Sequence, residues 1–124
     1  MKVGLYIPSE KESSRYVAFR VEISNSLSAR GIECVIGEGC LCDKPDLTGL
    51  DVVVAHPHYN NKNGCWDRIN KILAGNRNVH FFLFAMLNSK REEFFGDQPN
   101  LTYIKNRGFF SNPLTFLESK CKEA

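Results

Sequence analysis

Apolar runs alternate with amphipathic stretches along the whole chain. The runs predict five β-strands, at residues 2–7, 32–36, 51–55, 79–86 and 101–105. The run at 51–55, DVVVA, is apolar at successive positions and not only at alternate ones. This pattern predicts a strand that is buried on both faces, as in the centre of a parallel sheet.

A long helix is predicted after the first strand. Ser9 and Glu12 have the form of a capping box at its start, and Gly31 is placed to end it. Its apolar stripe follows spacings of three and four and consists of Tyr16, Phe19, Ile23 and Leu27.

Three further helices are predicted, and none of them lies between the second and third predicted strands. One begins at Asn63 or Gly64, a short polar one covers 89–95, and a last one is capped by Asn112. Segment 37–50 contains three glycines and a proline, so the helix expected there is short or missing.

This alternation predicts a single α/β domain over residues 1–124. Parallel strands joined by right-handed crossovers favour a flavodoxin-like, doubly wound sheet in the order 2-1-3-4-5, within a three-layer α/β/α arrangement. The ligand crevice of such sheets lies beyond the carboxyl ends of the first and third strands. The residues expected to line it are Ser9, Glu10, His56, His58 and Tyr59.

Composition narrows the classes of function. A formal charge of +2 over 124 residues argues against a nucleic-acid partner. The densest basic pair, Lys90 and Arg91, is followed by two glutamates, which is typical of a solvated helix surface. The apolar stretch near the amino terminus is shorter than a signal peptide or a membrane span requires, and the five cysteines are unevenly spaced. We expect a reduced, cytoplasmic protein that does not bind membranes.

Two short motifs carry metal-ligating side chains: CLC at 40–42 and HPH at 56–58. Thiolate and imidazole are zinc ligands, but structural zinc sites normally use C-x₂₋₄-C and H-x₃₋₅-H spacing. On this spacing we expect no metal site. The first loop lacks the glycines that wrap a phosphate, so we expect no flavin or other cofactor.

The element order and the end of the fifth strand resemble the receiver domain of bacterial response regulators. In YIK, Lys105 stands where receivers carry a lysine, and Gly64, the last residue of DVVVAHPHYNNKNG, lies near the position of the receiver's loop glycine. The receiver's chemical residues are replaced, because His56 stands at the phospho-acceptor aspartate and Phe84 at the hydroxyl residue. The resemblance therefore implies a pseudo-receiver that works by protein contacts.

A second resemblance is to TIR domains and nucleoside deoxyribosyltransferases. These families share the DVVV strand followed by a helix that carries an acidic residue, at the position of Asp67 in GCWDRI. This resemblance implies an alternative function, a small enzyme acting on a nucleotide N-glycosidic bond, with Asp67, His56 and Glu10 as candidate catalytic residues.

Aromatic residues flank the fifth strand, in FFGDQP and RGFFSNP. Aromatic side chains are enriched in interface cores. We therefore favour a non-enzymatic signalling or interaction module, which binds a protein partner or a second copy of itself. The contact residues would be Lys105, Phe109 and Phe110, and the sequence leaves any small-molecule ligand open.

Overall fold

The computed structural model describes residues 1–7, 14–37, 39–43, 45–58, 60–85, 89–105 and 115, with only the main chain described for 14–19. Five parallel strands form one sheet in the order β2-β1-β3-β4-β5. They are β1 (Lys2–Tyr6), β2 (Glu33–Ile36), β3 (Val52–Ala55), β4 (His80–Phe84) and β5 (Leu101–Ile104). The flavodoxin-like fold predicted from the sequence is confirmed.

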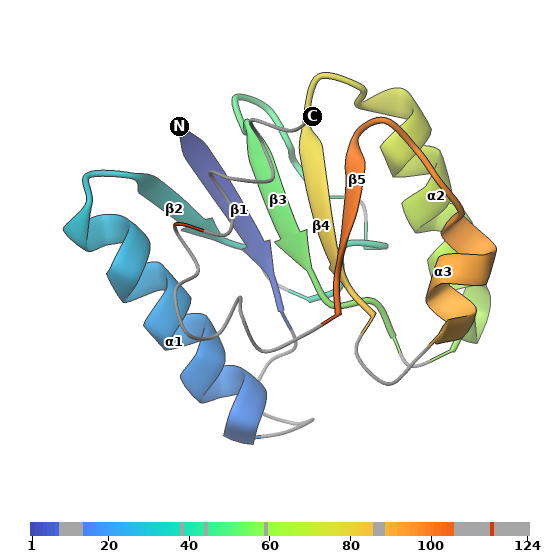
Figure 1. Cartoon of the computed structure of the whole chain (residues 1–124), viewed down its shortest axis with the longest axis horizontal. Helices are drawn as coiled ribbons and strands as arrows, with labels where there is room; N and C mark the ends of the chain where they lie inside the picture. The colour runs from blue at the N-terminus through green and yellow to red at the C-terminus, as the bar shows by residue number, and fades with distance from the viewer. Residues whose placement is uncertain are drawn as a thin grey trace.

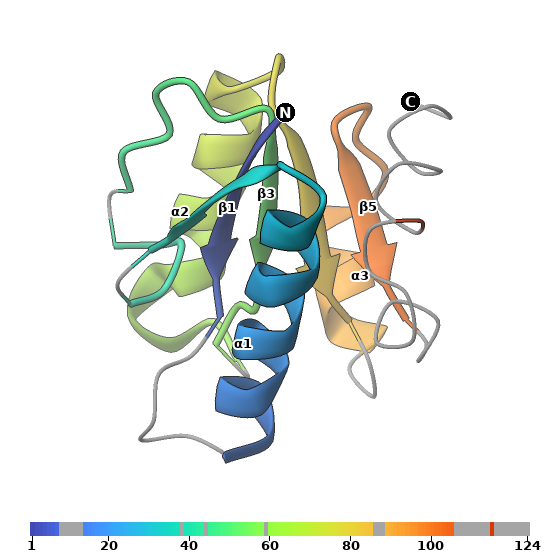
Figure 2. The same cartoon turned by 90° about the vertical axis from the view of Figure 1, so that its left-hand side faces the viewer.

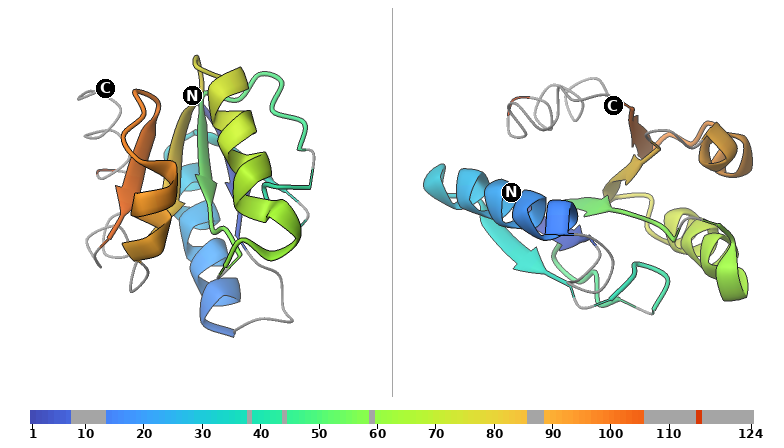
Figure 3. Two further views of the ribbon diagram at one scale, coloured as in Figure 1. Left: turned by 90° about the vertical axis from the view of Figure 1, so that its right-hand side faces the viewer. Right: turned by 90° about the horizontal axis from the view of Figure 1, so that it is seen from below.

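Helices cover both faces of the sheet (Figures 1 and 3). They are α1 (Ser14–Ala29), the single 3₁₀ turn η1 (Lys62–Gly64), α2 (Cys65–Gly75) and α3 (Ser89–Phe95). α1 lies on one face, and α2 and α3 lie on the other. The predicted last helix at 112–121 falls outside the described residues. Within the described part of the chain, no helix combines the length and apolar character needed to span a membrane.

The two faces of the sheet carry separate hydrophobic cores. Successive residues of β3 alternate between them: Val52 and Val54 pack toward α1, whereas Val53 and Ala55 pack toward α2. Both sets are fully or almost fully buried, which is why residues 52–55 are all apolar. β3 is thus the central strand that the sequence predicted.

Segment 37–50 takes the place of a helix between β2 and β3. Its described residues contain no helix, and they pass over the α2 side of the sheet (Figure 2). Leu41, Cys42 and Leu50 are buried there in the same core as α2. Its first residue, Gly37, lies so close to the Tyr6 ring that an added Cβ would come within 2.1 Å of it. The described residues of 37–50 therefore cover the part of the α2-side core that a helix between β2 and β3 would otherwise cover.

Candidate functional site

The predicted crevice lies at the carboxyl ends of β1 and β3, and the structure describes two of its expected residues, His56 and His58. Ser9, Glu10 and Tyr59 lie outside the described residues. The His56 amide donates to the Tyr6 carbonyl (3.0 Å), which continues the strand pairing by one residue. The His56 ring is tilted against Phe84, with centroids 5.6 Å apart, and its Nδ1 lies 2.9 Å from the Pro57 carbonyl oxygen.

The surroundings of His56 keep its imidazole neutral. Burial, and secondly the positive charge of Arg91, lower the pKa of His56 to about 4. A general base works best with a pKa near the working pH. With this pKa, His56 is a poor proton acceptor at neutral pH.

Arg91 fills the space beside His56. It comes from α3, is only 3% exposed, and donates from Nη1 to the Phe84 carbonyl (2.5 Å). Its Nη2 donates to the carbonyls of Pro57 (2.9 Å) and His58 (3.2 Å). The expectation that Arg91 lies on a solvated surface is wrong. Its guanidinium is buried and donates hydrogen bonds to carbonyls at the end of β4 and just after the end of β3. Sequence spacing did contain a signal: Arg91 precedes the buried Phe95 by four residues, so both lie on one face of the helix.

Asp67, the candidate residue of the enzymatic alternative, lies exposed in the first turn of α2. Its Oδ2 accepts a hydrogen bond from Asn61 Nδ2 (3.0 Å), and Asn61 Oδ1 accepts one from the Trp66 amide (2.8 Å). A carboxylate at a helix amino terminus is also favoured by the helix dipole. These contacts give Asp67 a structural role at the start of α2.

Lys105 lies at the end of β5 and is exposed. Its Nζ pairs with Glu92 of α3 at 3.0 Å, whereas Phe109 and Phe110 lie outside the described residues. Of the aromatic pair on α3, Phe95 is buried and Phe94 is 38% exposed. Phe94 packs edge-on against Trp66, with ring centroids 5.6 Å apart.

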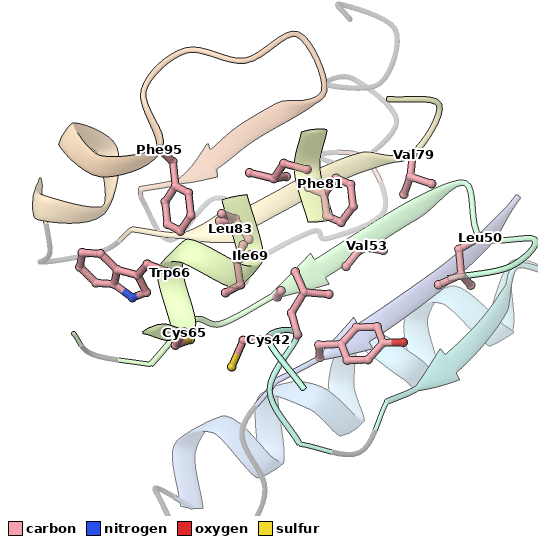
Figure 4. Packing of buried hydrophobic residues seen from close by; sticks show 14 residues of the cluster. Cys42, Leu50, Val53, Cys65, Trp66, Ile69, Val79, Phe81, Leu83 and Phe95 are labelled. Carbon is pink, nitrogen blue, oxygen red and sulfur yellow. The ribbon is translucent and has the colours of Figure 1, made fainter. Parts of the chain in front are cut away.

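Four metal-ligating side chains come together next to this crevice: Cys40, Cys42, His58 and Cys65. Their ligand atoms all lie within 4.8 Å of one another, and the sulfurs of Cys40 and Cys65 are 3.6 Å apart. Figure 4 shows Cys42 and Cys65 close together beside the first turn of α2. Three separate segments supply the cluster: the loop after β2, the loop after β3 and the first residue of α2.

The chain path explains how an atypical spacing brings these donors together. Residues 40–43 form a turn in which the Asp43 amide donates to the Cys40 carbonyl (3.0 Å) and the Cys40 amide to Asp43 Oδ2 (3.2 Å). The turn directs the Cys42 amide toward Cys40 Sγ (3.5 Å). This turn brings the donors together although the C-x-C spacing is not typical of structural zinc sites.

The thiols of the cluster perturb one another. The hydrogen bond between the Cys40 and Cys65 thiols raises the pKa of Cys40 and lowers the pKa of Cys65. Burial raises the pKa of Cys42. Cys65 also accepts a main-chain hydrogen bond from His58 and lies at a helix amino terminus. Among the three thiols, that of Cys65 is the one most readily ionised.

Two surface hollows lie at the opposite edge of the sheet, beside the amino ends of β3 and β4. Asp51, Asn78 and Val79 line both of them. His80, which borders one hollow, has its pKa lowered by burial and lies 2.7 Å from Thr102 Oγ1 through Nε2. Neither hollow contains the candidate catalytic residues His56 and Asp67.

Comparisons with protein-family models, with curated proteins and with solved structures find no match to this chain. The functional argument therefore depends on the fold and on the contacts at the carboxyl edge of the sheet.

Proposed function

We propose that this chain is a non-enzymatic protein-interaction module with a receiver-like fold. The observation that carries the proposal is the position of Arg91, whose guanidinium is buried against the carbonyls of Phe84, Pro57 and His58. Receiver chemistry needs a carboxylate and a hard metal ion at the end of β3. Here this position holds a neutral imidazole beside a fixed positive charge, which disfavours a divalent cation.

Two properties of the candidate catalytic residues argue against the enzymatic alternative. Asp67 is engaged with Asn61 at the start of α2, and the pKa of His56 is too low for an efficient base. Two of the three candidate catalytic residues are thus committed to other contacts.

The outer surface of α3, together with the adjoining end of β5, is the proposed docking face. It presents the Glu92–Lys105 ion pair and the exposed Phe94, whose ring is held in place by Trp66. A rigid, partly exposed aromatic side chain beside charged groups suits the centre and rim of a protein interface. The partner is therefore expected to be a protein, with a second copy of this chain as one candidate.

A set of amide NMR titrations tests the non-enzymatic assignment. The labelled chain would be titrated with Mg²⁺ plus beryllofluoride, and separately with NAD⁺ and nucleosides. We expect the amides of His56 and Asp67 to stay in place. Saturable shifts of both with NAD⁺ or a nucleoside would instead favour glycosidic-bond chemistry.

Site-specific photo-crosslinking tests the docking face. A photoreactive residue would replace exposed Lys90 on α3 and, as the matched control, exposed Glu22 on α1. We expect a discrete crosslinked product between the chain and its protein partner only when the probe stands at position 90 on α3. The substitution Lys105→Glu should abolish this product. Equal adducts from both positions would contradict the assignment of this face.

A further inference from the structure

We propose that Cys40, Cys42, His58 and Cys65 bind one Zn²⁺ ion as a tetrahedral Cys₃His site. The donor set is that of structural zinc centres, in which thiolates and imidazoles complete the coordination. Four ligands from the protein leave no position for substrate, so the site is structural. The inference is independent of the proposed interaction function.

The geometry fits a zinc ion. With Zn–S bonds of about 2.3 Å and tetrahedral angles, two sulfur ligands lie about 3.8 Å apart. Cys40 Sγ and Cys65 Sγ are 3.6 Å apart, and the other ligand atoms lie within 4.8 Å. The widest separation therefore has to shorten by only about 1 Å to reach the tetrahedral spacing.

Neighbouring groups hold the ligands in position. Trp66 Nε1 donates to the His58 carbonyl (3.0 Å), and Arg68 Nε donates to the Cys42 carbonyl (3.0 Å). The first turn of α2 thus fixes both loops relative to Cys65, which begins that helix. Such outer contacts orient metal ligands and reduce the cost of assembling them.

The charge balance favours a divalent, sulfur-seeking ion. Binding would displace the three thiol protons, and three thiolates with Zn²⁺ carry a net charge of −1. The guanidinium of Arg68, which contacts the Cys42 side chain as well as its carbonyl, would partly neutralise this charge. Mg²⁺ and Ca²⁺ prefer oxygen ligands, so the donor set selects against them.

Such a site would compensate for the missing helix. The described residues of segment 37–50 cover part of the core without a helix or strand, and irregular segments of this length are uncommon in compact domains. A metal ion would fasten the 40–43 turn to the end of β3 and the start of α2. The described part of this segment would then be fixed by coordination bonds as well as by the burial of Leu41 and Leu50.

Metal binding to the reduced, full-length chain is the direct test. Native mass spectrometry is expected to show one zinc per chain. Titration of the metal-free protein with Co²⁺ should give the intense visible bands of tetrahedral thiolate coordination, and one equivalent of Zn²⁺ should abolish them. Failure to bind either ion in stoichiometric amount would overturn the proposal.

Substitutions locate the site. Cys65→Ala should weaken Co²⁺ binding by at least about 100-fold, since loss of an outer-shell contact alone costs 10- to 100-fold. Cys34→Ala is the matched control, because Cys34 is half-buried on β2 outside the cluster, and it should bind like the unmodified chain. Equal affinities of both variants would contradict the assignment.

A third variant covers the case in which Cys65→Ala does not fold. His58 is only half-buried, so His58→Ala should keep the fold, checked by circular dichroism. We expect it to bind Co²⁺ with a changed visible spectrum, since one nitrogen ligand is lost. An unchanged spectrum would remove His58 from the site and overturn the Cys₃His assignment.

Discussion

At the scale of single residues, the positive charge of Arg91 helps to keep the imidazole of His56 neutral. Arg91 is held by three main-chain carbonyls, and its charge is the second cause, after burial, of the low pKa of His56. Receivers need a negative charge at this point in the sheet, whereas this chain places a positive one there. A flavodoxin-like fold can therefore be built without the acidic site that receivers use.

The low pKa of His56 predicts a pH-dependent stability. Its pKa in the folded chain, about 4, lies below the ordinary value of 6.5. The unfolded chain therefore takes up the proton first, so the free energy of unfolding should fall as pH drops from about 6.5 to about 4. The contribution of His56 to this loss should be about 3 kcal/mol and should level off below a pH of about 4. Urea unfolding at a series of pH values would measure it.

Arg91→Met provides the internal check on this prediction. Removal of the guanidinium should raise the pKa of His56 part of the way toward 6.5, because burial remains. The pKa of His80, at the other end of β4, should not move. Ring proton NMR of the histidines would follow both groups. A His56 that titrates near 6.5 in the unmodified chain would show that its ring is solvated.

At the scale of elements, the start of α2 depends on a residue outside the helix. Asn61 joins the helix to the preceding loop through Trp66 and Asp67. The alternation of apolar residues predicted the helix and its start near Gly64. It could not predict this contact, because an asparagine at position 60 or at position 61 would fit a loop equally well.

Substitution of Asn61 tests the importance of this contact. Asn61→Ala should lower the free energy of unfolding by about 1 kcal/mol, as the loss of a helix cap does. Asn60→Ala is the matched control, because Asn60 is its exposed neighbour, and it should change stability by less than about 0.5 kcal/mol. Chemical denaturation of both variants would compare them; equal effects would show that the Asn61 hydrogen bonds add no stability.

At the scale of the whole molecule, the fold could be predicted from the sequence, because buried positions recur with the regular periods of strands and helices. Apolar runs such as 51–55 predicted all five strands, with ends within one or two residues of those observed. The sites depend on contacts between distant segments and were harder to predict. Cys42 and Cys65 come together because a turn redirects the loop after β2, and Arg91 is buried although arginine is mostly exposed.

Asn100 joins distant elements at the amino edge of the sheet, as Arg91 does at the carboxyl edge. It is 4% exposed, and its Nδ2 donates to the carbonyls of Leu73 (3.1 Å), Asn76 (3.1 Å) and Val79 (3.3 Å). These contacts link the end of α2 to the chain entering β4 and β5. Both edges of the sheet are thus held by a buried polar side chain that donates to carbonyls of other segments.

Asn100→Asp would keep the shape of the side chain and replace its donor group by an acceptor. Three carbonyls would each lose the Asn100 donor and face a carboxylate, although those of Leu73 and Asn76 keep the amides of Asn76 and Val79 as donors. The free energy of unfolding should therefore fall by about 2 kcal/mol. Asn78→Asp is the matched control at an exposed position and should cost less than about 0.5 kcal/mol. Because a protonated carboxyl group can again donate, the difference between the two variants should narrow in acid. Urea unfolding at neutral pH and at pH near 4 would measure both effects, and a neutral-pH difference below about 1 kcal/mol would mean that water or local rearrangement satisfies these carbonyls.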